Sequence, residues 1–196
     1  FTLGREKVKS WGEYAIANYL FTSGIKYEYE KRWHDNTFGN YKPDFTIFQD
    51  DNINNNIIIE YYGIDRDNNN KTMPEIDSQA YNDQIARKDA FHSRAKTNYL
   101  KYYYDQARDG TLIENLEQDL KKQGVIFNKK SDSELLDVFI EGGYYDLFSK
   151  LTAEFLTQFK SNQLDLKDLL HQHRDDKRTT AYLEIFSWVF SEYQKE

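Results

Sequence analysis

Two short apolar segments, separated by a polar stretch, constrain the fold of this chain more than any other feature. They are YKPDFTIF (41–48) and IIIEYYGI (57–64), and both are rich in the β-branched and aromatic residues typical of strands. The polar stretch QDDNINNN between them has the composition of a turn. Pro43 lies near the start of its segment, where a strand tolerates proline. The sequence therefore predicts a β-hairpin over residues 41–64.

Helical and strand patterns surround this hairpin. A capping-box pattern at residues 10–13 (SWGE) predicts the start of a helix, which we expect to end at Gly24. Residues 25–33 alternate as a strand does, and residues 75–95 carry helical spacing. Residues 97–104 (TNYLKYYY) resemble a further strand, although their clustered aromatic residues also allow a helix.

The pattern changes after Gly110. Helical spacing is found over five segments: 112–122, 133–140, 144–160, 164–171 and 180–194. A strand-rich part followed by an all-helical part favours an α/β unit with a helical segment attached. We therefore expect one domain over residues 1–110 and a second, helical part over residues 111–196.

Composition narrows the possible chemistry. The chain has no cysteine, which excludes disulfides and thiolate metal ligands and is compatible with the cytoplasmic location that we expect. Its four histidines are scattered, so a bound metal would have oxygen ligands, which favours Mg²⁺ or Mn²⁺. No apolar run approaches the roughly 20 residues of a membrane span, so we expect no membrane partner. Because the chain begins at Phe1 without a signal pattern, we interpret it as a piece of a larger protein.

The net charge of −7 weighs against a nucleic-acid binder that acts alone. Affinity for DNA comes mainly from Lys and Arg on phosphates. A nuclease cleft nevertheless concentrates carboxylates that metal ions neutralise, and another domain of the same protein can supply the grip on DNA.

Asp44 and Glu60 are the candidate metal ligands. The period of a strand places Glu60 on one face with Ile58 and Tyr62, and a Glu in such an apolar strand is costly to bury unless it is paired or metal-bound. Asp44 interrupts the preceding strand directly after Pro43. Two carboxylates on adjacent strands can converge on one divalent cation. The alternative is that each simply faces solvent or pairs with a nearby Lys or Arg.

The segments KPDF and IIIEYYG, which contain Asp44 and Glu60, resemble the motif of the PD-(D/E)xK nuclease superfamily. The resemblance implies a restriction-endonuclease-like mixed sheet flanked by helices and a catalytic Mg²⁺ held by Asp44 and Glu60. The backbone carbonyl of Ile59 would be a further ligand. Glu13 matches an additional Glu that many members place on the first helix, although its capping-box position explains it equally well.

The chain departs from the family pattern at Tyr62, where a Lys is expected two residues after Glu60. Several branches of the superfamily carry this Lys on the following helix, and the segment ARKDAFH (86–92) resembles such a branch, with Lys88 as the substitute. The alternative is that Lys88 is a solvated helix residue paired with Asp83 or Asp89.

Four further residues are expected to contact the substrate or to order the cleft. They are Tyr62, Tyr81, Arg87 and His92. Packing of the helix explains Tyr81 and His92 equally well.

Over nearly its whole length the chain resembles the nuclease insertion of UvrD/Rep-type superfamily I helicases related to DNA helicase IV. Besides the segments above, the resemblance rests on VKSWGEYAIANYLFTSGIKYEYE (8–30), GTLIENLEQDLKKQGV (110–125) and the helical segments 133–162 and 181–196. It implies a Mg²⁺-dependent endo- or exodeoxyribonuclease, with Mn²⁺ as a possible substitute. Its partners would be DNA and the rest of the parent helicase, in DNA repair or phage defence.

The chain has no GxxxxGK[ST] segment, so it cannot hydrolyse ATP by the Walker route. The alternative to a nuclease is a catalytically silent module of the same fold that binds DNA or protein. Tyr62 and the negative charge favour this alternative, whereas Asp44, Glu60 and Lys88 favour the nuclease.

Overall fold

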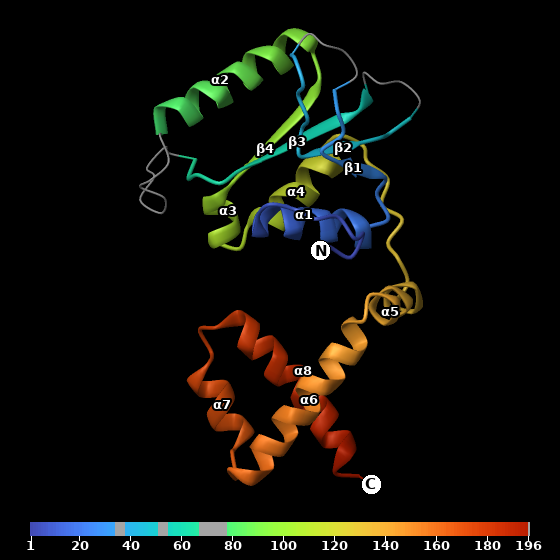
Figure 1. Cartoon of the computed structure of the whole chain (residues 1–196), viewed down its shortest axis with the longest axis vertical. Coiled ribbons are helices and arrows are strands. Elements are labelled where there is room, and N and C mark those ends of the chain that lie inside the picture. The colour runs from blue at the N-terminus through green and yellow to red at the C-terminus, as the bar shows by residue number, and fades with distance from the viewer. Residues whose placement is uncertain (34–37, 51–54, 67–77, 196) are drawn as a thin grey trace. The chain divides into compact units, whose positions relative to one another are not determined.

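The structure, a computed structural model, describes residues 1–33, 38–50, 55–66 and 78–195. It is an α/β protein with a mixed sheet and a helical C-terminal segment, as expected (Figure 1). Its elements are α1 (Trp11–Thr22), β1 (Tyr27–Tyr29), β2 (Phe45–Ile47), β3 (Ile57–Tyr62), α2 (Ser78–Ala95), β4 (Asn98–Tyr103), α3 (Tyr104–Arg108), α4 (Leu112–Lys122), α5 (Asp132–Glu141), α6 (Tyr144–Ser161), α7 (Leu166–Gln172) and α8 (Lys177–Tyr193).

The described strands form one sheet in the order β1-β2-β3-β4. Strands β1, β2 and β3 pair antiparallel, and β4 pairs parallel with β3. The β2–β3 pairing, with Phe45 opposite Ile59, confirms the predicted hairpin, although residues 51–54 of its turn lie outside the described residues. Residues 98–103, for which the sequence allowed a strand or a helix, form a strand that pairs with β3.

Strand β3 is buried along its whole length because both of its faces are covered. Helices α1 and α4 lie on one side of the sheet and α2 lies on the other (Figure 1). Ile57, Ile59 and Tyr61 pack in the cluster with α1 and α4, whereas Tyr62 packs with residues of α2. The predicted alternation of faces is therefore confirmed, and it turns Glu60 towards α2.

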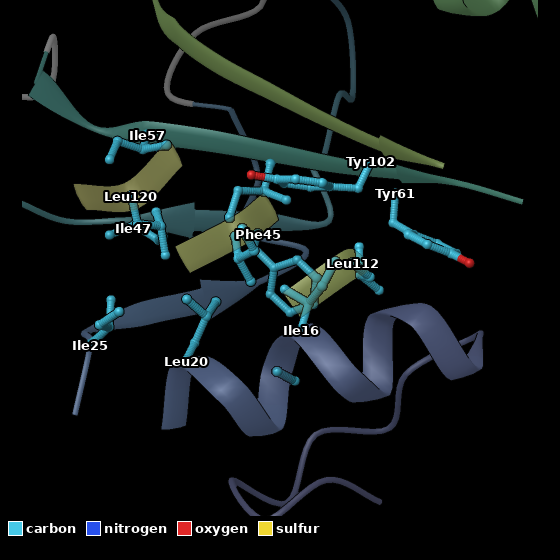
Figure 2. Close-up of a cluster of buried hydrophobic side chains, with 13 residues drawn as sticks. Ile16, Leu20, Ile25, Phe45, Ile47, Ile57, Tyr61, Tyr102, Leu112 and Leu120 are labelled. Carbon is cyan, nitrogen blue, oxygen red and sulfur yellow. The ribbon is translucent and has the colours of Figure 1, made fainter. Parts of the chain in front are cut away.

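The main core lies between the sheet and the helices α1 and α4 (Figure 2). Ile16 and Leu20 of α1 meet Phe45 and Ile47 of β2 there. Their spacing of four residues places both side chains of α1 on the face that meets the sheet. Helix α4 adds Leu112, Leu116 and Leu120 at the same spacing.

Helix α1 begins and ends where the sequence predicts. The Ser10 hydroxyl accepts a hydrogen bond from the Glu13 N–H, which is one half of the capping box. The Glu13 carboxylate, however, accepts from the Lys9 N–H rather than from that of Ser10. Gly24 follows the helix in the left-handed region, with a φ of 66°, and a Cβ at this position would lie 1.9 Å from the Asn128 carbonyl oxygen. Glycine is therefore required there.

Helix α2 connects the parallel strands β3 and β4 and begins at Ser78 in the structure. A crossover helix of this kind is the usual way to join parallel neighbours. The first residues of the expected helix, 75–77, lie outside the described residues, as do residues 67–74 of the loop before it.

The first compact unit extends to Leu135, beyond the boundary expected at residue 110. Helix α4 accounts for this difference, because its three leucines are buried in the core of the sheet. The change from strand-rich to helical sequence at Gly110 therefore does not coincide with the end of the compact unit.

The second compact unit, Leu136–Glu196, is helical. Aromatic rings join α6 to α8: Phe155 and Phe159 each contact Phe186, at centroid distances of 4.6 and 5.3 Å. Phe190 extends this cluster by contacting Phe159. Across the described part of the chain, no helix combines the length and the apolar character needed to cross a membrane.

We expect Leu116→Ala to lower the free energy of unfolding of the sheet unit by about 2–5 kcal/mol, because Leu116 is fully buried between α4 and the sheet. Urea denaturation followed by circular dichroism measures this change. Leu147→Ala is the control, since Leu147 is 66% exposed and its removal should cost less than about 0.5 kcal/mol. Equal effects of the two substitutions would contradict the assignment of α4 to the sheet unit.

Candidate active site

Asp44 and Glu60 lie together at one side of the sheet. Asp44 directly precedes β2, and the β2–β3 register places it opposite Glu60. The Asp44 Oδ2 accepts a hydrogen bond of 2.7 Å from the backbone N–H of Tyr61, which holds the side chain against β3. Both carboxylates line one pocket of about 200 Å³. The structure thus brings together the two residues expected as metal ligands.

The electrostatics of this pair favour a bound cation. Burial and the nearby charge of Glu60 raise the pKa of Asp44 to about 7, although the Tyr61 N–H partly opposes the shift. Glu60 is itself only 2% exposed. Asp44 is half-buried, so the two carboxylates repel each other in a partly desolvated pocket, and a divalent cation between them would relieve that repulsion.

The protein ligands that the described residues offer are few. Within residues 1–33, 38–50, 55–66 and 78–195, no three His, Asp or Glu side chains form a group that could hold a metal ion. Mg²⁺ is commonly bound by one or two carboxylates, with water and substrate phosphates completing its shell. Asp44 and Glu60 fit that pattern, and Ile59, with its side chain fully buried in the core, could add only its backbone carbonyl.

Lys88 reaches the same pocket from α2. Its Nζ lies 2.5 Å from the Glu60 Oε2 and 5.5 Å from the ring centroids of both Tyr41 and Tyr62. The alternative partners proposed for Lys88 are engaged elsewhere, because Asp89 pairs with Lys101 and Asp83 accepts from Gln79. The structure therefore places a lysine beside Glu60 in this pocket, and it comes from α2 rather than from the strand that carries Glu60.

Glu13 also lines this pocket. Its Oε2 accepts hydrogen bonds from the Tyr29 hydroxyl, at 2.6 Å, and from the Lys9 N–H, at 3.1 Å. Glu13 is therefore both a structural acceptor at the start of α1 and a carboxylate facing the same pocket as Asp44 and Glu60.

Close packing shapes the pocket on the side of α1. A Cβ on Gly12 would lie only 2.1 Å from the Tyr61 ring, so the absence of a side chain at Gly12 lets this ring pack against α1. The ring of Tyr61, which follows Glu60 on β3, thereby contacts the helix that carries Glu13.

The four residues expected to contact the substrate separate into two groups. Tyr62 and Tyr81 line the pocket; the Tyr62 hydroxyl bonds that of Tyr99 at 2.6 Å, and the Tyr81 hydroxyl accepts from the Gly63 N–H. Arg87 is exposed on α2 and is not among the residues that line the pocket. His92 is only 1% exposed and is not among the residues that line this pocket.

Sequence patterns did not indicate Tyr41. Its hydroxyl donates a hydrogen bond of 2.6 Å to the Glu60 Oε1, and its pKa is raised by burial and by the charge of Glu60. Tyr41 precedes the first residue of β2, where no periodicity marks its direction. Sequence patterns did not indicate Lys9 and Gln84 either, which line the pocket, because single polar residues carry no pattern.

We expect Asp44→Asn to stabilise the metal-free protein above pH 7. The folded-state pKa of Asp44, about 7, lies above the unfolded value of about 3.9. The stability that its proton contributes is therefore complete below about pH 4 and is lost as the pH rises through 7. An Asn oxygen can still accept from the Tyr61 N–H.

Urea denaturation in EDTA at several pH values tests this expectation. Between pH 5 and 8 the wild type should lose about 1–3 kcal/mol relative to Asp44→Asn, since one pKa unit corresponds to about 1.4 kcal/mol. Asp137→Asn, a change at an exposed carboxylate of α5, should leave the pH dependence of the wild type unaltered. Parallel curves for the wild type and Asp44→Asn would contradict the expectation.

Comparison with known proteins leaves the family of this chain open. Neither family models nor curated proteins nor solved structures gave a match. The family resemblance inferred from the sequence motifs therefore stays a prediction, and the candidate site stands on its own geometry.

Proposed function

We propose that this chain is a metal-dependent deoxyribonuclease domain with a restriction-endonuclease-like fold of the PD-(D/E)xK type. The observation that carries the proposal is the convergence of Asp44, Glu60 and Lys88 in one pocket, although they come from three separate segments. Two acidic ligands beside one lysine are the groups that hydrolysis of a phosphodiester by this route requires.

Asp44 and Glu60 would hold Mg²⁺ or Mn²⁺, with the Ile59 carbonyl as a further ligand. Such an ion, when bound, lowers the pKa of water and stabilises negative charge on a phosphate. Asp44 would bind it through Oδ1, because its Oδ2 already accepts the hydrogen bond from the Tyr61 N–H. Glu13, which also lines the pocket, would orient water or a second ion.

Lys88 would supply the positive charge that Tyr62 cannot. Hydrolysis adds a water oxygen to phosphorus and breaks the bond to the leaving sugar oxygen, and negative charge grows on the phosphate oxygens meanwhile. The Lys88 ammonium, held beside Glu60 and between two tyrosine rings, can donate a hydrogen bond to those oxygens or to the attacking water. A fixed charge in a partly dry pocket is worth more than the same charge in water.

The substrate has to reach a pocket in a chain of net charge −7. Tyr81 lines the pocket and offers a ring on which an unpaired base can stack. We propose that the main grip on the DNA backbone comes from the remainder of a parent superfamily I helicase. A role in DNA repair or in defence against phage follows from that context.

A catalytically silent module for binding DNA or protein is the alternative. It is favoured by Tyr62, which occupies the position of the expected lysine and bonds Tyr99, and by the acidic net charge. The direction of Lys88 separates the two proposals, because a lysine turned to solvent would suit the silent module better. The contact between Lys88 and Glu60 therefore favours the nuclease.

The test is cleavage of labelled single- and double-stranded DNA in the presence of Mg²⁺, Mn²⁺ or EDTA. We expect cleavage that depends on the metal and that falls by about 10²-fold or more in Glu60→Ala and in Lys88→Ala. Glu60→Gln should lose activity as well, although it can keep the hydrogen bond from Tyr41.

Matched controls come from the ion pair of Lys121 and Glu117 on α4, whose separation is also 2.5 Å. Lys121→Ala and Glu117→Ala should cleave like the wild type, since both residues lie outside the pocket. Cleavage that survives Glu60→Ala would refute the proposed site. A folded chain that cuts with none of the metals would favour the silent module.

A further inference from the structure

A chain of hydrogen bonds runs from Glu60 away from the pocket into the protein. The Tyr41 hydroxyl lies 2.6 Å from the Glu60 Oε1 and 2.8 Å from the His92 Nε2. The other ring nitrogen of His92, Nδ1, lies 2.8 Å from the Thr97 hydroxyl. These four residues come from β3, from the segment before β2, from α2 and from the turn before β4.

The chemistry of each group sets the direction of these bonds. A carboxylate can only accept, so Tyr41 donates to Glu60, and its phenol oxygen is then free to accept from the Nε2–H of His92. Burial lowers the pKa of His92 to about 4, so the ring is neutral at pH 7 and carries a single N–H. With that proton on Nε2, Nδ1 accepts from the Thr97 hydroxyl. All the bonds are satisfied in one consistent arrangement.

The Glu60 carboxylate is consequently held at both oxygens. Tyr41 binds Oε1 and Lys88 binds Oε2, so the plane of the carboxylate cannot rotate without breaking one of the two contacts. Groups that orient a ligand from behind change metal affinity or activity by about 10–100-fold when removed.

Aromatic packing keeps Tyr41 and His92 in place. The ring of Phe91 stacks on that of Phe38 at 4.6 Å and meets Trp33 at 5.3 Å. Trp33 also contacts Tyr41 and His92, at 6.0 and 5.7 Å. This cluster joins α2 to Trp33 and Phe38, which lie between β1 and β2 in the sequence, and it packs against the rings of both Tyr41 and His92.

His92 also lies one helical turn after Lys88, on the same side of α2. The bond from His92 to Tyr41 therefore fixes the position of the helix that carries Lys88, as well as the carboxylate that Lys88 meets. Because Lys88 is on a helix and not on the strand that carries Glu60, a contact between the two elements is needed to hold Lys88 near Glu60.

We propose that Tyr41 and His92 are positioning residues that hold the Glu60 carboxylate and the Lys88 helix in the geometry that binds the metal ion. This inference rests on the proposed nuclease function. It assigns Tyr41, which no sequence motif marked, and it gives His92 a buried role in place of the expected contact with the substrate.

Mn²⁺ titration of the purified chain, followed by calorimetry and by thermal stabilisation, tests the proposal. We expect Tyr41→Phe to weaken Mn²⁺ binding about 10-fold or more and to lower kcat for DNA cleavage with little change in KM. The control is Tyr27→Phe, which removes a similar hydrogen bond of 2.8 Å, from Tyr27 to Glu6, outside the pocket. It should leave Mn²⁺ affinity unchanged.

His92 provides a second test that does not depend on Tyr41→Phe. His92→Leu removes the donor to Tyr41 and should weaken Mn²⁺ binding, whereas the amide of His92→Gln can donate in its place and should restore most of the affinity. Because the two residues act in one chain, Tyr41→Phe/His92→Leu should bind Mn²⁺ no more than about two-fold more weakly than Tyr41→Phe alone.

The outcomes separate this inference from the function on which it rests. Wild-type protein that binds Mn²⁺ and cuts DNA, with Tyr41→Phe and His92→Leu matching it in affinity and kcat, would overturn the inference and leave the nuclease standing. Wild-type protein that neither binds Mn²⁺ nor cuts DNA would overturn both. If Tyr27→Phe weakened Mn²⁺ binding as much as Tyr41→Phe, the effect would reflect a general loss of stability. That result would also overturn the inference.

Discussion

The burial of Glu60 is the constraint on which the rest of this structure depends. A carboxylate that is 2% exposed in a strand of isoleucines and tyrosines costs several kcal/mol unless its oxygens are bonded. Tyr41 and Lys88 supply those bonds, and each comes from a different segment. The cost of one buried charge is thus offset only when β3, α2 and the segment before β2 are assembled together.

The two faces of β3 have different surroundings. Its Ile57 and Ile59 face is apolar and packs with α1 and α4, which gives the sheet its core. The opposite face carries Glu60 and Tyr62 and meets α2, where the ion pair of Glu60 and Lys88 lies beside a second, smaller apolar cluster. The main core and the candidate site therefore lie on opposite sides of one strand, and a change in the core need not disturb the pocket directly.

Local sequence was sufficient for most of the elements and for part of the site. Alternation in IIIEYY gives each residue of β3 its face, and Ser10 caps α1 through a contact three residues away. Asp44 and Glu60 stood out because a carboxylate within an apolar strand is unusual. The extent of the sheet unit was not predictable in this way, because the amphipathic pattern of α4 does not say which surface its leucines will cover.

What the sequence by itself determined is local: the β2–β3 hairpin, most helix boundaries, and the two acidic residues that interrupt apolar strands, whereas β4 became certain only through its pairing with β3. Only the tertiary structure decided which residues meet at the pocket. Lys88 lies 28 positions from Glu60 in the chain, and Tyr41 lies 51 positions from His92. Contacts over such distances leave no periodic trace, because each residue need only satisfy its own helix or strand. Arg87 illustrates the same limit of prediction from sequence. It directly precedes Lys88 on α2, yet its side chain is exposed to solvent.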